Sequence, residues 1–488
     1  MVTREPRQIC TALLLAALLA GSLRAGEPEN AVIAPPESLL DQVIELNRIH
    51  EPELDAVALR TEFNALVEKA RTALTPLKTP QEKVAALNKV LLTDRKVAYL
   101  SNKYWRDATL AASVLRAQGN CLSTSTLYVL IGKALDLPIK MVLVPRHAYA
   151  RWDDGTVRIN IETTYGGAEL PDAHYLSGVR QPAPDDIEKL GWGRSLTDTQ
   201  VIGELHAIAA GHRTGESRIE DAIVLLEKAI AAMPERRDLE LRRYRLMSTL
   251  PGRRLLARQK VIQVLQDGKN PLPSGVQCDA LVFLAQEAAA EGDYQQERTL
   301  LLGAFARAPK SDQLHVLSSL AFCHRSMKDY RGAVRYMELA SALDPDNDST
   351  LYNLAILQKN DGRLDDALTT IRRARKINPE SWNLHIMEAG YLIFAGKREE
   401  GMKLYETLEK PRADVEFWEI MQTWFMAASQ QREKFYTQFE RALSLARSPR
   451  ILEWIEQDPD LDVYRNETEF KDLVAKHRPR LLQEGEKK

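Results

Sequence analysis

Three residue types that together could carry out nucleophilic chemistry occur within one short stretch of the chain. Cys121 lies in the segment GNCLSTSTLYVL (residues 119–130), His147 follows Pro145 and Arg146, and Glu162 comes soon after. A thiolate can attack a carbonyl carbon, an imidazole can accept and return the proton, and a carboxylate can orient the imidazole. If the fold brings the three together, these residue types predict acyl-transfer chemistry.

The sequence around Cys121 predicts the start of a helix. Asn120 is a favourable N-cap residue, and apolar residues then recur at helical spacing: Leu122, Leu127, Leu130, Ile131, Ala134 and Leu135. In the first turn, the helix dipole and the free backbone N–H groups favour a thiolate over a thiol. The alternative is an inert, buried cysteine, which is a common fate of a free Cys.

The segments HAYARW and TVRINIE, separated by Asp-Asp-Gly, predict a β-hairpin. A two-residue Asp154–Gly155 turn pairs Asp153 with Thr156 and sets His147 directly opposite Glu162, with Cβ atoms about 4.5–5.5 Å apart. Alternation places two sets of side chains on opposite faces. Tyr149, Arg151, Arg158 and Asn160 share the polar face, and Ala148, Ala150, Trp152, Val157, Ile159 and Ile161 share the core face.

A cysteine at a helix start, a histidine that begins a strand and an acid that ends the next strand resemble the transglutaminase-like superfamily of papain-related thiol enzymes. The resemblance spans about residues 37–167. It rests on GNCLSTSTLYVLIGKALDLPIKMVLVPRHAYARW and INIETTYGG, with weaker support from LNRIHEPELD and AALNKVLL. Several bacterial members carry tetratricopeptide repeats after the thiol domain.

The resemblance implies that Cys121 is the nucleophile, His147 the general base and acid, and Glu162 the group that orients the imidazole. The superfamily usually has aspartate where this chain has the longer Glu162. The Cys121 N–H is the expected first donor of an oxyanion hole, which needs at least two donors. Gln118 and Asn102 are candidates for the second donor, and Asn120 and Asn160 are further supporting residues.

The N-terminus carries the pattern of a secretory signal peptide. Arg4 and Arg7 precede the apolar run TALLLAALLA (residues 11–20), and small residues follow up to Ala25. That run is shorter than the roughly 20 residues that span a bilayer. We therefore expect a signal peptide over residues 1–25, and an exported mature chain, periplasmic or secreted, with no membrane span.

The remaining sequence predicts an α+β domain of the transglutaminase-like type over residues 26–196, followed by an all-α solenoid. In the first part, helices are expected over residues 39–49, 59–74, 80–92 and 107–118, and a strand over 139–144.

From residue 197 to 450 the chain is repetitive: Ala333, Ala340 and Pro345 recur 34 residues later as Ala367, Ala374 and Pro379. This period resembles the tetratricopeptide repeat, in about five to six copies. Polar, solvated capping helices and a tail are expected over residues 451–488.

Composition argues against several other functions. A net charge of −2 and a pI of about 6.6 do not suit a protein that binds nucleic acid through bulk charge. After cleavage of the signal peptide, Cys121, Cys278 and Cys323 remain, too few for a disulfide framework. The histidines of the repeats lack ligand spacing, so we expect no metal and no cofactor.

Two functions remain open. The first is an exported thiol amidase, peptidase or acyltransferase with a Cys-His-Glu triad, whose repeats recruit a protein substrate or partner. The second is a non-catalytic scaffold, in which a repeat groove binds a protein or peptide and the transglutaminase-like domain is only a binding surface. In the branch of the transglutaminase-like superfamily that this chain resembles most, many members lack the cysteine, whereas this chain retains all three groups.

Overall fold

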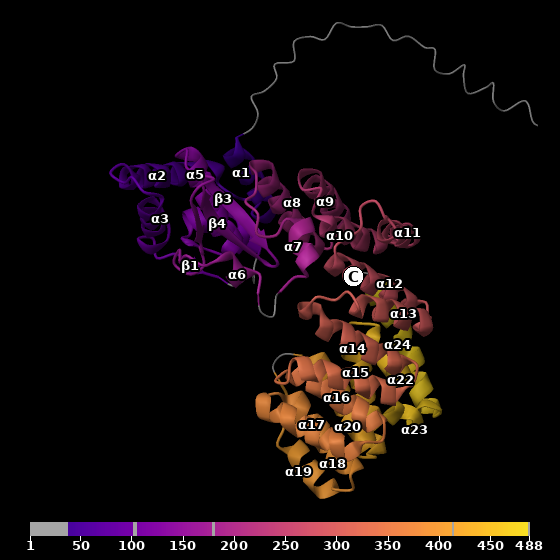
Figure 1. Cartoon of the computed structure of the whole chain (residues 1–488). Helices are drawn as coiled ribbons and strands as arrows, with labels where there is room; N and C mark the ends of the chain where they lie inside the picture. Colours follow the sequence, from indigo (N-terminus) through magenta and orange to yellow (C-terminus); the bar gives the residue numbers. More distant parts are fainter. Residues whose placement is uncertain (1–37, 101–104, 178–180, 412–413, 487–488) are drawn as a thin grey trace, which may run out of the picture.

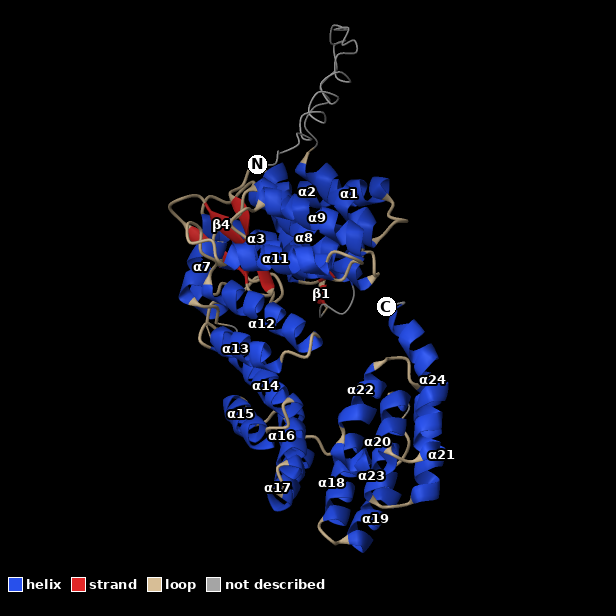
Figure 2. Cartoon of the chain, turned by 90° about the vertical axis from the view of Figure 1, so that its right-hand side faces the viewer, coloured by secondary structure: helices blue, strands red, loops and turns tan. Residues whose placement is uncertain are grey.

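The computed structural model describes residues 38–100, 105–177, 181–411 and 414–486. An α+β domain comes first, and a long series of paired helices follows it and curves away in an arc (Figure 1). Among the described residues, all strands lie in the first domain (Figure 2). The expected fold class, an α+β domain followed by an all-α repeat array, is confirmed.

Helices form most of the first domain. They are α1 (Leu39–His50), α2 (Ala56–Leu74), α3 (Pro80–Asn88) with the π-helical turn η1 (Lys89–Thr93), the 3-10 turn η2 (Trp105–Ala108), α4 (Leu110–Leu115), α5 (Cys121–Ala134), α6 (Asp172–Tyr175) and α7 (Pro184–Leu190). The helices expected over residues 39–49, 59–74 and 80–92 are confirmed.

The helix expected over residues 107–118 is shorter than the prediction. Thr109 caps α4 by accepting a hydrogen bond from the Ala112 N–H at 3.2 Å, and α4 ends at Leu115. Ala117 then adopts φ = +47°, which turns the chain out of the helix. Gln118–Gly119 instead forms strand β2, which pairs in parallel with β1 (Ala98–Tyr99).

The main sheet has the antiparallel order β3 (Ile139–Val144), β4 (His147–Asp153), β5 (Arg158–Ile161). Its core face carries the predicted apolar residues Ala148, Ala150, Trp152, Ile159 and Ile161, all buried in one cluster with residues of α2 and α5. The strand expected over residues 139–144 and the assignment of apolar side chains to the core face are confirmed.

The predicted hairpin turn is wrong by one residue. The structure pairs Asp153 with Arg158 and Arg151 with Asn160, so Gly155 and Thr156 form the tip of the loop. The cause is local: one carboxylate oxygen of Asp154 accepts hydrogen bonds from the Thr156 and Val157 N–H groups at 2.9 and 2.7 Å. This side-chain turn competes with the two-residue backbone turn. His147 and Glu162 stay on one face but are diagonal neighbours, not directly opposite.

Helices α8 to α21 pair into seven successive hairpins within the described residues. The pairs are α8 (Asp198–Gly215) with α9 (Ile219–Ala232), α10 (Arg237–Ser248) with α11 (Arg254–Leu265), α12 (Ser274–Ala290) with α13 (Tyr294–Phe305), α14 (Lys310–Ser326) with α15 (Tyr330–Leu343), α16 (Asp348–Asn360) with α17 (Leu364–Ile377), α18 (Trp382–Phe394) with α19 (Arg398–Glu406), and α20 (Val415–Ala428) with α21 (Arg432–Leu445). The recurring alanines Ala333, Ala340, Ala367 and Ala374 are fully buried, as close helix crossing requires.

The first repeat helix also belongs to the core of the α+β domain. Val201 and Leu205 of α8 lie in the same buried cluster as Leu127 of α5 and Ile159 of β5. Helix α8 packs on both α1 and α9. The start of the repetitive sequence near residue 197 is therefore not a break between two hydrophobic cores.

The C-terminal segment comprises α22 (Arg450–Gln457), η4 (Pro459–Leu461), α23 (Asp462–Arg465) and α24 (Thr468–Glu486). It is not the solvated cap that its polar composition suggests, because Leu461 and Tyr464 are buried in the core of the last hairpins. Asp460 also reaches back to form an ion pair with Lys359 of α16 and accepts a hydrogen bond from Trp424 of α20 at 2.8 Å.

No helix among the described residues combines the length and the apolar character needed to cross a membrane.

Candidate active site

Cys121 is the first residue of α5, as predicted. The Asn120 side chain accepts hydrogen bonds from the N–H groups of Leu122 and Ser123 at 3.0 and 3.1 Å, and the Ser123 hydroxyl accepts one from the Asn120 N–H at 3.0 Å. This capping box uses the second and third N–H groups of the helix. The Cys121 N–H makes no hydrogen bond within the described residues, so it is available to an oxyanion.

Gly119 allows this helix start to pack closely. A Cβ at position 119 would lie 2.2 Å from the Ser123 hydroxyl oxygen, the same atom that completes the capping box. Only a residue without a side chain fits there, so the Gly-Asn-Cys order has a steric cause. The cause concerns the helix start and is independent of any reaction.

His147 and Glu162 form a direct pair across the diagonal of β4 and β5. The His147 Nε2 and Glu162 Oε2 atoms are 2.8 Å apart. Diagonal residues on neighbouring strands are further apart than directly opposite ones, by about 2–3 Å. The extra methylene of glutamate, relative to the aspartate of the resembling family, bridges that added distance.

Glu162 is held rigidly by its neighbours. Its other carboxylate oxygen, Oε1, accepts hydrogen bonds from the Thr164 N–H at 2.9 Å and the Thr164 hydroxyl at 2.5 Å. Burial by itself would raise the pKa of Glu162, but the hydrogen bonds from His147 and Thr164 outweigh it and hold the pKa below its usual value. Glu162 is therefore ionised at neutral pH and orients the imidazole.

His147 is placed between Glu162 and Cys121. Burial would lower the pKa of His147, but the hydrogen bonds and negative charges of Cys121 and Glu162 raise it to about 9. Because Glu162 occupies Nε2, Nδ1 is the ring nitrogen that remains for Cys121. At neutral pH the imidazole is protonated, as a proton donor to a leaving group must be.

The threonine and serine residues after Cys121 connect the helix to the segment directly after β5, which carries Glu162. The Thr124 hydroxyl lies 2.7 Å from the Thr163 hydroxyl, and Ser125 lies 3.4 Å from the same oxygen. Thr163 and Thr124 are both buried. This contact fixes the end of β5 against the start of α5, and so fixes the distance between the carboxylate and the thiol.

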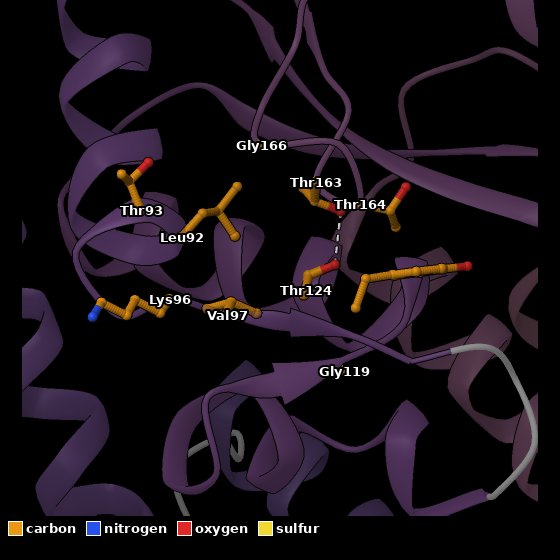
Figure 3. A pocket seen from close by; sticks show the side chains of 10 residues that line it. Leu92, Thr93, Lys96, Val97, Gly119, Thr124, Thr163, Thr164 and Gly166 are labelled. Atoms are coloured by element: carbon orange, nitrogen blue, oxygen red, sulfur yellow. Dashed lines mark hydrogen bonds between the residues drawn. The ribbon is translucent and has the colours of Figure 1, made fainter.

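A cavity of about 240 Å³ adjoins this contact (Figure 3). Thr124, Thr163 and Thr164 line one side and Leu92 and Val97 another, with Gly119 and Gly166 at its edges. Cys121 and His147 do not line it. The cavity thus borders the start of α5 and the segment that follows Glu162, and its walls carry both hydroxyl and apolar groups.

The supporting residues proposed from sequence have different positions. Asn120 is the helix cap, and Gln118 lies in β2 opposite Ala98. Asn160 does not approach the His147–Glu162 pair. Its side chain accepts a hydrogen bond from Arg151 Nε at 2.7 Å and donates to the Leu170 carbonyl at 2.8 Å and to Asp172 at 2.7 Å. Asn102 lies outside the described residues.

Tyr175 is a neighbour of the site that the sequence did not indicate. Its ring stacks on His147, with centroids 5.8 Å apart and planes inclined by 16°. Tyr175 belongs to α6, which follows β5 after a loop. No periodicity or motif connects it to the hairpin, so only the folded chain reveals this contact.

The other cysteines are unsuited to nucleophilic chemistry. Cys278 and Cys323 are buried between repeat helices, and neither forms a disulfide. Burial, together with nearby carboxylates, raises the pKa of each thiol to about 12. Within the described residues, no group of three or more His, Cys, Asp or Glu side chains is arranged to hold a metal ion.

Comparison with protein-family models identifies a transglutaminase-like superfamily domain over residues 58–184 and a tetratricopeptide repeat over residues 324–385. The resemblance inferred from the sequence is thereby confirmed: the chain carries a transglutaminase-like domain followed by tetratricopeptide repeats. No curated protein matches the chain.

Several solved structures are similar to the chain. PilF from Pseudomonas aeruginosa is 12% identical, with a TM-score of 0.36, over 57% of this chain and 100% of its own. PilW, a type IV pilus biogenesis factor, is 13% identical, with a TM-score of 0.36, over 44% of this chain and 96% of its own. YrrB, a TPR protein with an unusual peptide-binding site, is 11% identical, with a TM-score of 0.25, over 41% and 82%.

Proposed function

We propose that this transglutaminase-like chain is an exported thiol enzyme that transfers acyl groups from amides, with its repeats recruiting a protein substrate or partner. The observation that carries the proposal is the position of His147. Its Nε2 lies 2.8 Å from Glu162 Oε2, and Cys121, at the start of α5, is close enough to raise the pKa of the imidazole. This arrangement supports the roles of nucleophile, proton carrier and orienting carboxylate for three side chains that come from α5, from β4 and from the residue after β5.

The first half of the reaction forms a thioester. The Cys121 thiolate attacks the amide carbonyl carbon, a C–S bond forms, and the carbonyl π electrons move to oxygen. The free Cys121 N–H donates to that oxygen. The intermediate then collapses, the C–N bond breaks, and the His147 imidazolium gives its proton to the departing amine.

The second half releases the acyl group. Water or an amine attacks the thioester carbonyl while the neutral His147 imidazole accepts its proton, and the C–S bond breaks to restore the Cys121 thiolate. Attack by water completes hydrolysis to a carboxylic acid, as in an amidase or peptidase. Attack by an amine forms a new amide, as in cross-linking.

Selective alkylation tests the nucleophile. We expect iodoacetamide at pH 7 to modify Cys121 at least about 100-fold faster than Cys278 or Cys323, whose thiols stay protonated. The modified residue is identified by peptide mass spectrometry. His147→Ala should slow the reaction at Cys121, and Cys121→Ala should abolish release of amine from a library of peptide amides.

Cys278→Ala is the matched control, because it removes a buried thiol and leaves the site intact. It should react and turn over like the wild type. Equal labelling of all three cysteines, with unchanged turnover in Cys121→Ala, would contradict the proposal.

The non-catalytic scaffold is the second candidate function. One observation favours it: the Cys121 residue is only 6% exposed, and the adjoining cavity is not lined by it. A scaffold predicts that Cys121→Ala preserves both partner capture and the function of the strain that carries it. Loss of function with normal expression and normal partner capture would exclude a role as scaffold alone.

The proposal of export rests on the basic and apolar pattern of residues 1–25, which lie outside the described part of the chain. The mature protein should begin near residue 26 when its N-terminus is sequenced. An intact N-terminus on the protein recovered from cells would contradict export by this route.

A further inference from the structure

Helix α6 covers the polar face of β4 and β5 next to the candidate active site. Its first residue, Asp172, accepts hydrogen bonds on one oxygen from Tyr149 at 3.0 Å, Arg151 at 2.5 Å and Asn160 at 2.7 Å. These three donors all belong to the face that the sequence predicted to be polar. Helix α6 therefore covers the part of this face around Tyr149 and Arg151, which are both buried, whereas Arg158 on the same face stays exposed.

Arg151 is the centre of this anchoring. Its side chain is 2% exposed, and besides Asp172 it donates to the Asn160 side chain, the Tyr149 hydroxyl and, at 3.0 Å, the Gly193 carbonyl. A buried guanidinium that donates from all three of its nitrogens fixes the segments around it. Helix α6 thus has a defined position relative to β4.

The anchored helix places the Tyr175 ring over two side chains of β4. The ring centroid is 4.1 Å from that of Tyr149 and 5.8 Å from that of His147, with planes inclined by 10° and 16°. The Tyr175 hydroxyl is buried beside the Glu162 carboxylate, which raises the pKa of that hydroxyl, and the two groups do not form a hydrogen bond of normal length and angle. The stacked ring is the best-defined contact of Tyr175 at the site.

We propose that Tyr175 is a positioning residue of the Cys121–His147–Glu162 site, whose ring holds the His147 imidazole in plane and keeps water from the His147–Glu162 hydrogen bond. This inference rests on the proposed function. The χ2 angle of histidine has broad wells, so two hydrogen bonds alone leave the ring free to rock. A nearly parallel aromatic ring blocks that motion and lowers the local dielectric, which strengthens the hydrogen bond.

The imidazole Nε2–H proton of His147 reports directly on this role. In full-length protein at pH 6–7 the imidazole is protonated, because its pKa is about 9, and the Nε2–H donates to Glu162. A proton that is hydrogen-bonded and shielded from water gives a separate downfield NMR resonance. We expect Tyr175→Ala to speed its exchange with water at least about tenfold, and alkylation of Cys121 by iodoacetamide to slow.

Two variants separate the ring from its surroundings. Tyr175→Phe keeps the stacked ring and should retain both the resonance and the alkylation rate. Leu176→Ala removes a neighbouring apolar side chain of the same small cluster but neither of the stacked rings, and should also retain both. Thermal unfolding shows whether each variant is folded.

The inference is overturned if Tyr175→Ala keeps the wild-type resonance and alkylation rate. It is also overturned if Tyr175→Phe loses the resonance as Tyr175→Ala does, since the hydroxyl would then be responsible. Failure of the proposed function looks different: Cys121 of the wild type would be no more reactive than Cys278, while the Nε2–H resonance would still respond to Tyr175→Ala.

Discussion

At the scale of single residues, the site depends on the length of one side chain. Glu162 reaches His147 across the diagonal of the hairpin, and Thr164 holds its second oxygen. Each bond to the carboxylate favours its ionised form, and the resulting charge helps to keep His147 protonated. The glutamate is thus matched to the register of this hairpin.

Glu162→Asp should therefore impair the site almost as much as Glu162→Gln, although it keeps the charge. The pKa of His147 is raised to about 9, so its proton is held below pH 9 and lost as the pH rises through that value. Both variants should lower the pKa of His147, and with it the upper pH limit of amide turnover, toward the ordinary histidine value of about 6.5. The pH dependence of amide turnover measures the shift, and Thr164→Ser, which keeps both bonds to Glu162, is the control. A Glu162→Asp variant with the wild-type pH profile would show that the length of Glu162 is not needed for its contact with His147.

At the scale of elements, the start of α5 joins Cys121 to the rest of the candidate site. Asn120 and Ser123 satisfy the helix end, and Thr124 contacts Thr163 at the end of β5. The four hydroxyl residues after Leu122 are all buried. They therefore act as structural connections around Cys121, a role that their position in the sequence left open.

Gly119→Ala should destabilise the chain by roughly 1–3 kcal/mol, because the new methyl group overlaps the Ser123 hydroxyl. The double variant with Ser123→Ala removes the overlap and should recover part of the loss, a non-additive effect. Urea unfolding followed by circular dichroism measures both. Gly268→Ala is the matched control, because a Cβ there meets nothing within 4 Å. Equal effects of Gly119→Ala and Gly268→Ala would contradict the steric account.

At the scale of the whole molecule, the C-terminal segment closes part of the repeat array. Asp460 lies against Lys359 of α16 and Trp424 of α20, the first helices of two hairpins that are not adjacent. The Lys359 ammonium also lies over the Phe394 ring of α18, at 4.7 Å from its centroid. This part of the repeat surface is occupied by the chain itself, so the proposed partner would engage the earlier hairpins.

Asp460→Ala should cost about 1–3 kcal/mol in the unfolding of the repeats, because it takes the nearest carboxylate from the mostly buried Lys359 ammonium. Lys359→Met removes the charge itself. The double variant with Asp460→Ala should therefore lose less unfolding free energy than the sum of the losses in the two single variants. The exposed pair Arg363–Glu338 is the control, and Glu338→Ala should change stability by less than about 1 kcal/mol. Similar losses in Asp460→Ala and Glu338→Ala would show that the buried pair does not hold the segment.

The features that depend on neighbours in the chain follow from the amino-acid sequence. Alternation along β4 and β5 put His147 and Glu162 on one face, Asn120 marked the helix start at Cys121, and the 34-residue period indicated paired helices. Each of these follows from local geometry: the period of a strand, the unsatisfied N–H groups of a helix end, or the repeat of a packing contact.

The remaining features depend on contacts that form only in the folded chain. The bonds of the Asp154 side chain moved the turn by one residue and made the His147–Glu162 pair diagonal. Tyr175 stacks on His147 because Asp172 is bound to Arg151, and α8 fills the core of the first domain although its sequence begins the repeats. Such contacts join segments far apart in the chain, and they are selected by packing and by pairing of buried polar groups, which no local pattern encodes.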